Sequence, residues 1–175
     1  MTAPLNAFTS SLLALALLTG AALKFDAPQG WVAKAPGSSM RVAEFTLPKV
    51  AGDAEDAALA IFFFGGQGGS VQANLDRWIG QMTQPDGRPS KDLAKTTKIS
   101  PRGLPITLVD VSGTYVAETA PGSAEHHNSP NFRLRAGVVQ TPGGPYFIKL
   151  TGPAKTVAAQ SQPFDRFVAS LSYAR

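Results

Sequence analysis

The chain has 175 residues, of which 43% are hydrophobic and 16% are charged, a composition typical of a folded protein rather than a disordered one. Sixteen basic against twelve acidic side chains give a formal net charge of +4, an excess too small to indicate nucleic acid binding. The absence of cysteine excludes disulfides, thiolate metal ligands and a cysteine nucleophile.

Residues 1–22 carry no charged side chain and contain an apolar run that ends in the small residues at 20–22. The run is too short for a comfortable membrane span and resembles the hydrophobic part of a secretory signal. Because no lysine or arginine precedes it, a buried first helix is the alternative. We expect residues 1–22 to be removed on export, so that one domain, 23–175, remains in the periplasm or outside the cell without a transmembrane span.

Two or three strands are predicted before the first helix, from the segments 23–28, 38–48 and 57–64. The third is apolar on both faces, a pattern typical of a central strand that is covered on both sides. Ser70 is placed to cap the helix that follows. Apolar residues then recur at helical spacing, at Val71, Leu75, Trp78, Ile79 and Met82. Because Trp78 lies on this stripe, we expect it in the core rather than in a ligand pocket.

The second half of the chain predicts more strands and a closing helix. A short strand is expected near residues 95–100, and longer ones at 104–116, 131–140 and 146–150, the last two joined by a hairpin turn. An apolar helical stripe closes the chain, and Pro163 should kink or divide that helix. The sequence therefore predicts an α+β domain with a mostly antiparallel sheet of about six to seven strands, flanked by helices on its faces.

Several segments resemble the Mog1/PsbP-like fold, in particular an uncharacterised secreted bacterial branch of it. The segments that resemble the fold are "FDAPQGW" (25–31), "MRVAEFTLP" (40–48), "GGPYFIKLTGPAKTV" (143–157) and "FDRFVASL" (164–171). The segments that resemble the bacterial branch are "NLDRWIGQM" (74–82) and "NFRLRAGVV" (131–139). The resemblance covers roughly residues 23–175. It implies an α/β/α sandwich and a binding or accessory role, since known members are a partner of a small GTPase, photosystem II subunits and envelope lipoproteins. It supplies no catalytic motif.

The glycine-rich stretch "FFFGGQGGS" (62–70) is the first candidate site, with Gly66, Gly68 and Ser70 as weak binding candidates. A glycine loop between a strand and a helix holds phosphate in nucleotide-binding proteins. Here, however, no lysine follows to meet a triphosphate, and the third glycine of a dinucleotide motif is replaced by Val71. We therefore expect a connector without magnesium-dependent binding of ATP, GTP or NAD.

The loop 117–130 holds both histidines of the chain, His126 and His127. Adjacent side chains in an extended loop point apart and do not easily share one metal ion. We therefore expect a mobile, solvated loop and no metal site, although a small-molecule or metal site in this loop is an alternative. A Ser-His-acid triad would require one of these histidines to be held rigidly.

The segment 88–102 is the most basic of the chain, and Lys91, Lys95 and Lys98 are its candidate binding residues. It contains no aromatic side chain, so stacking on nucleic acid bases is not expected. Taken together, the sequence predicts an exported, non-catalytic binding or accessory protein of the bacterial envelope. Its partner is expected to be a protein or another envelope component, without a cofactor. A small-molecule or metal binder comes second and an enzyme third.

Overall fold

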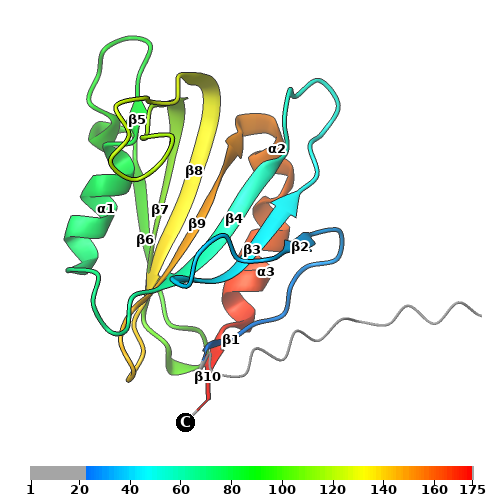
Figure 1. Ribbon diagram of the computed structural model, residues 1–175, viewed down its shortest axis with the longest axis vertical. Coiled ribbons are helices and arrows are strands. Elements are labelled where there is room, and N and C mark those ends of the chain that lie inside the picture. Colours follow the sequence, from blue (N-terminus) through cyan, green and yellow to red (C-terminus); the bar gives the residue numbers. More distant parts are fainter. Residues whose placement is uncertain (1–22, 175) are drawn as a thin grey trace, which may run out of the picture.

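The computed structural model describes residues 23–174 as one eight-stranded antiparallel sheet, a two-stranded sheet and three helices (Figure 1). The large sheet contains β2 (Val32–Lys34), β3 (Arg41–Leu47), β4 (Ala57–Phe63), β5 (Met82–Thr83), β6 (Lys95–Ile99), β7 (Ile106–Tyr115), β8 (Ser129–Val139) and β9 (Tyr146–Pro153). The small sheet pairs β1 (Leu23–Lys24) with β10 (Ser172–Tyr173). The helices are α1 (Val71–Ile79), α2 (Ala154–Ala159) and α3 (Ser161–Ser170), and two short 3₁₀ turns are η1 (Ser90–Asp92) and η2 (Pro101–Gly103).

The order of strands in the large sheet is β2-β3-β4-β9-β8-β7, and both β5 and β6 pair with the outer edge of β7. All these pairs are antiparallel. The predicted α+β class and its antiparallel sheet are therefore confirmed. The sheet has eight strands rather than six or seven because β2 and β5, of three and two residues, are too short for a period-two pattern to reveal.

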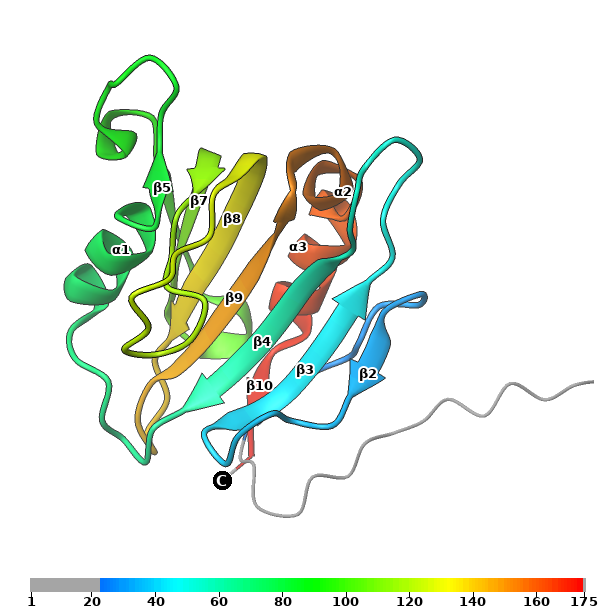
Figure 2. The same cartoon turned by 45° about the horizontal axis from the view of Figure 1, so that its top comes forward.

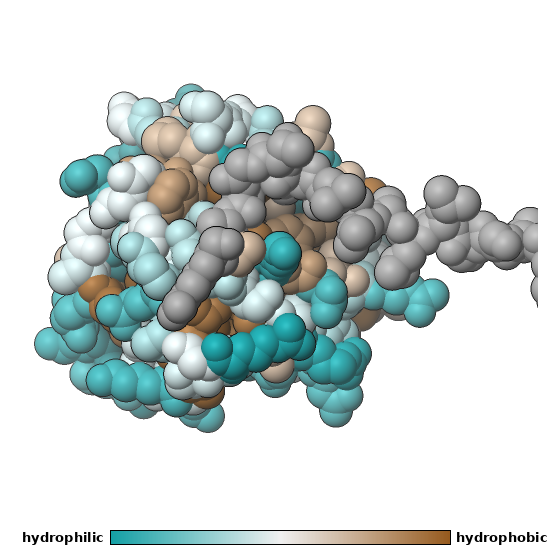
Figure 3. Space-filling model, turned by 90° about the horizontal axis from the view of Figure 1, so that it is seen from below, coloured by the Kyte–Doolittle hydropathy of each residue, from teal (hydrophilic) through white to brown (hydrophobic). Residues whose placement is uncertain are grey.

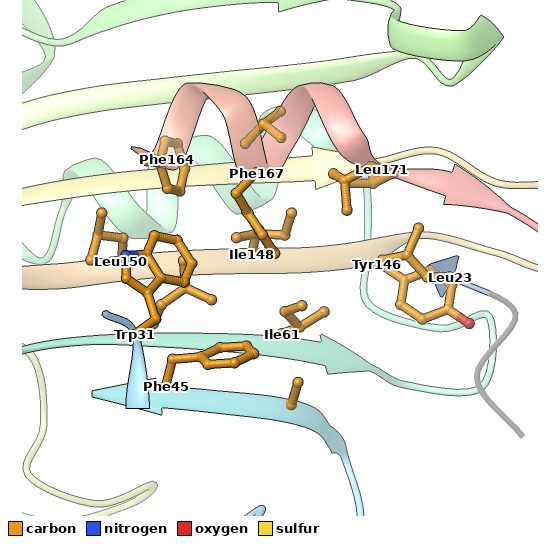
Figure 4. Packing of buried hydrophobic residues seen from close by; sticks show 14 of the residues in the cluster. Leu23, Trp31, Phe45, Ile61, Tyr146, Ile148, Leu150, Phe164, Phe167 and Leu171 are labelled. Carbon is orange, nitrogen blue, oxygen red and sulfur yellow. The ribbon is translucent and has the colours of Figure 1, made fainter. Parts of the chain in front are cut away.

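Helix α1 lies on one face of the sheet, and α2 and α3 lie on the other (Figures 1 and 2). The larger core cluster fills the α3 face. There Phe167 packs against Trp31, with ring centroids 5.2 Å apart, while Phe164, Ile148 and Leu150 are also buried (Figure 4). The predicted stripe of the closing helix thus faces the core. The helix is divided at Gln160, and Pro163 lies in the first turn of α3.

The second core cluster lies under α1. Leu75 and Trp78 of the helix pack with Met82 and with residues of β7, β8 and β9, among them Val109 and Phe147. The helix ends at Ile79, earlier than the apolar stripe predicted, and Met82 reaches the same cluster from β5. Trp78 is 3% exposed, and its core position is as expected.

Each face of the sheet is covered over only part of its width. Helix α1 contacts β7 and β8, whereas α2 contacts β8 and β9. On the α1 face, no helix therefore lies over the strands β4, β3 and β2 (Figure 2). On the α3 face, the helix α3 ends its coverage before β6, so β6 is left without a helix over it. These two uncovered parts lie diagonally opposite each other.

Helices of residues 23–174 are too short and too polar to cross a membrane. Seen from below, the hydrophobic residues on the visible surface form separate spots between hydrophilic ones (Figure 3). The predicted removal of residues 1–22 falls outside the described residues and stays a prediction.

Candidate functional site

A lysine interrupts an otherwise apolar stretch of β9. Lys149 lies in β9 between Ile148 and Leu150, which are both buried on the α3 face. Because successive side chains of a strand alternate, Lys149 points to the α1 face, as Phe147 does. It is half-buried there.

The ammonium group of Lys149 is held by neutral oxygens. Its Nζ donates hydrogen bonds to Oε1 of Gln81, at 2.6 Å, and to the hydroxyl of Tyr115, at 2.9 Å. Gln81 follows α1 and Tyr115 ends β7, so two distant segments meet at this lysine. None of the ion pairs within residues 23–174 includes Lys149. A lysine that is this buried ordinarily has a carboxylate partner.

Two arginines add to the positive charge. The guanidinium of Arg41 lies 5.4 Å from the ring centroid of Phe62 and pairs with Glu44, and Arg77 on α1 donates to Oδ1 of Asn74. Burial, followed by the charges of Arg77 and Arg41, lowers the pKa of Lys149 to about 8. We call this group the Lys149 surface. It consists of Arg41, Phe62, Arg77, Gln81, Tyr115 and Lys149.

The sheet beside the Lys149 surface is lined with small side chains. Ala58 is exposed, and Ala60, Thr46 and Thr151 are half-buried. The Oγ1 atom of Thr151 is buried and has no hydrogen-bond partner among the described residues. Because these alanine and threonine side chains are small, the strands β3, β4 and β9 are accessible to a partner on the α1 face of the sheet.

Replacing Lys149 with methionine should stabilise the protein at neutral pH. Below pH 8 the lysine is charged in both the folded and the unfolded chain, so folding carries the full cost of burying the charge. As pH rises from about 8 to the ordinary value of 10.5, the unfolded chain holds more protons and the wild type gains stability. We expect Lys149→Met to be about 1–2 kcal/mol more stable at pH 7, allowing for partial exposure and two lost hydrogen bonds.

Urea unfolding at pH 7, 8, 9 and 10 would measure this effect, because the advantage of Lys149→Met should shrink across the series. Lys155→Met is the control, since Lys155 is exposed on α2, and it should change stability by less than about 0.5 kcal/mol at pH 7. A Lys149→Met protein that is less stable than wild type at pH 7 would contradict the prediction.

The glycine-rich stretch forms the turn between β4 and α1. Gly66 and Gly68 have φ angles of +87° and +125°, and the Oγ of Ser70 accepts a hydrogen bond from the backbone N–H of Ala73, as predicted for a cap. The amide of Asn74 donates to the carbonyl oxygens of both Gly68 and Ser70. The turn is therefore bonded internally, and Oδ1 of the same Asn74 accepts a hydrogen bond from Arg77.

The loop 117–130, which holds both histidines, is crossed by backbone hydrogen bonds that sequence reasoning did not predict. The backbone N–H of His127 donates to the carbonyl of Ala117, and Glu118 and His126 form an isolated bridge. The two imidazoles diverge, because Nδ1 of His126 lies 3.0 Å from the carbonyl oxygen of Val116 while the His127 ring packs against Tyr115. The polar composition did not reveal these backbone bonds, and the mobility of the loop stays a prediction.

The three candidate lysines of the basic segment are not gathered at one place. Lys91 lies in η1, while Lys95 and Lys98 lie on β6, three residues apart and therefore on opposite faces of the sheet. Lys95 points to the α3 face, across from Asp110. Their role in binding stays a prediction.

Sequence reasoning missed the Lys149 surface. One signal was present, because "YFIKL" (146–150) places a lysine inside an otherwise apolar strand. No sequence pattern singled out Arg41, Gln81 or Tyr115, since each of them lies in a segment where polar residues are common. Their proximity to Lys149 depends on the order of strands in the sheet.

Comparison with known proteins shows the fold alone. No protein-family model and no curated protein matches the chain. A solved Pseudomonas aeruginosa protein of unknown function, described as a candidate regulator, matches with a TM-score of 0.51 and 14% identity over 75% of this chain and 82% of its own. The cyanobacterial PsbP of Synechocystis sp. PCC 6803 matches with a TM-score of 0.47 and 11% identity, over 87% and 86% of the two chains. An antiparallel sheet between helices is the architecture that the Mog1/PsbP resemblance implied.

Proposed function

We propose that this protein is an exported, non-catalytic binding or accessory protein of the bacterial envelope, and that it binds an acidic partner protein through the Lys149 surface. One observation carries the proposal. Arg41, Arg77 and Lys149 come from three separate segments, and the charges of both arginines act on Lys149 beside the uncovered part of the sheet. Of the three, Arg41 alone is in an ion pair within residues 23–174, with Glu44.

The hydrogen bonding of Lys149 supports an anionic partner. An ammonium group has three N–H donors, and two of them are given to Gln81 and Tyr115. A carboxylate on the partner can accept from the third and supply the negative charge that the half-buried lysine lacks. Because an anion favours the charged amine, binding should weaken as pH rises through about 8.

The shape of the surface favours a protein over a small molecule. The alanines and threonines of β3, β4 and β9 form an open sheet area, while small-molecule sites are typically enclosed. Charged groups on such an open area mainly speed association and select the partner. Binding should therefore fall with ionic strength.

Crosslinking in cells tests this proposal. The tagged full-length chain would be expressed in a bacterium, crosslinked and enriched, and its partners quantified by mass spectrometry. A variant carrying Arg41→Gln, Arg77→Gln and Lys149→Met should lose its main partner by about tenfold or more, because three favourable charge contacts are removed.

The matched control carries Lys24→Gln, Lys155→Gln and Arg166→Gln, which removes the same amount of charge from exposed positions on β1, α2 and α3. It should retain the partner. Equal loss in both variants would show that net charge, and not the Lys149 surface, governs binding. Capture of the partner by cytoplasmic protein that still begins at Met1 would refute the envelope location.

A further inference from the structure

The outer edge of β6 is open. On its inner side β6 pairs with β7, from Lys95 opposite Asp110 to Ile99 opposite Ile106, and among residues 23–174 no strand pairs with its other side. All five residues of β6 are exposed, and the strand contains no proline. Such an edge presents unpaired backbone N–H and C=O groups that another extended chain can bind.

A trough runs along this edge on the α3 face. It consists of two adjoining depressions of about 540 and 400 Å³, and Lys95 and Asp110 line both of them. Leu93 borders the first depression and Ile99 and Thr97 border the second. Leu93 and Ile99, 37% and 36% exposed, are two of the four large hydrophobic residues that residues 23–174 leave exposed. The trough is thus apolar at both ends.

The charges within the trough leave Lys95 without a partner. Arg133 binds Asp110 through two hydrogen bonds of 2.8 and 2.6 Å, and Arg135 reaches both Asp110 and Asp165. Lys95 takes part in none of the ion pairs of the described chain, although it lies across from Asp110 in the sheet. The acids are therefore occupied, and the lysine in the middle of the trough is available to an outside carboxylate.

We propose that the β6 edge binds an extended peptide segment of a partner protein as an additional antiparallel strand. An acidic residue of the peptide lies opposite Lys95, and apolar residues lie opposite Ile99 and beside Leu93. Because alternate residues of a strand face the same side, the peptide pattern from its N-terminus is apolar, any, polar, any, acidic, any, apolar. The antiparallel direction follows the rest of the sheet.

The probe is a seven-residue peptide with blocked ends, valine-threonine-threonine-threonine-glutamate-threonine-valine, carrying a fluorescent label. Titration of the full chain at 150 mM salt should show saturable binding by anisotropy. Replacing the glutamate of the peptide with lysine should weaken binding about tenfold, and Lys95→Glu in the protein should do the same. The Lys95→Glu protein should in turn prefer the lysine peptide, since the pair is restored with its charges exchanged.

Lys98→Glu is the matched control, because it makes the same charge change on the same strand but on the opposite face of the sheet. It should alter affinity less than twofold. N-methylation of alternate peptide residues adds a second readout. Only the set whose N–H groups face β6 should abolish binding, as expected for strand pairing.

Absence of saturable binding at millimolar peptide, or equal effects of Lys95→Glu and Lys98→Glu, would overturn the proposal. Equal effects of N-methylation at the two sets of peptide positions would also overturn the proposal. A dimer of the chain that excludes the peptide from the β6 edge would overturn it as well. The triple variant at Arg41, Arg77 and Lys149 should bind the peptide like wild type. Failure of the β6 edge is therefore distinguishable from failure of the Lys149 surface.

Discussion

Trp78→Ala should lower the free energy of unfolding by about 3–5 kcal/mol, as other large aromatic truncations in protein cores do. The indole is 3% exposed, and its ring meets Phe147 edge-on with centroids 6.4 Å apart. Its removal leaves a cavity between α1 and strands β7 to β9, which the backbone hydrogen bonds of the sheet prevent from closing. Urea unfolding followed by far-UV circular dichroism measures the loss without relying on tryptophan emission.

Gln72→Ala is the control for α1. Gln72 lies on the exposed side of the helix, and its side-chain amide donates a hydrogen bond to Asp76. Truncating this side chain should change the free energy of unfolding by less than about 0.5 kcal/mol. A Trp78→Ala protein with wild-type stability that has lost partner binding would place Trp78 in a binding site instead of the core.

Gly68→Ala should destabilise the protein by about 2–4 kcal/mol, more than Gly66→Ala. At Gly68 the φ angle is +125°, and an added Cβ would lie 2.5 Å from Cζ of Phe147, so backbone strain and overpacking combine. At Gly66 the φ angle is +87°, but the nearest atom to an added Cβ is the carbonyl oxygen of Gly143 at 3.7 Å. For Gly66→Ala we therefore expect only the cost of the positive φ angle, a loss of stability of about 1–2 kcal/mol.

A double-mutant cycle with Phe147→Leu separates the two terms. Because the smaller side chain relieves the clash, the cost of Gly68→Ala should fall in the Phe147→Leu background, whereas the cost of Gly66→Ala should stay the same. Thermal and urea unfolding of the four proteins in each cycle give the energies. Equal costs of the two glycine variants in the wild-type background would disprove the clash at Gly68.

The candidate site was less predictable than the fold. The sequence marks Lys149 as a charged residue in an apolar strand, yet it does not show that Gln81 and Tyr115 are its partners. These residues are 68 and 34 positions away from Lys149 in the chain. They meet it because β9 is central in the sheet and α1 lies over β7 and β8. The predicted candidates at Gly66, Gly68 and Ser70 instead build a turn that Asn74 holds together.

The local features of this protein follow from short-range patterns in its sequence. The apolar run of β4, the cap at Ser70, the alternation of β8 and the division of the last helix near Pro163 each depend on neighbours a few residues away, which periodicity and backbone sterics control. Long-range packing, by contrast, places β9 between β4 and β8, with α1 on one face of the sheet and α3 on the other. Strand order depends on how distant apolar surfaces bury one another, so the positions of the Lys149 surface and the open β6 edge follow from packing across the whole chain.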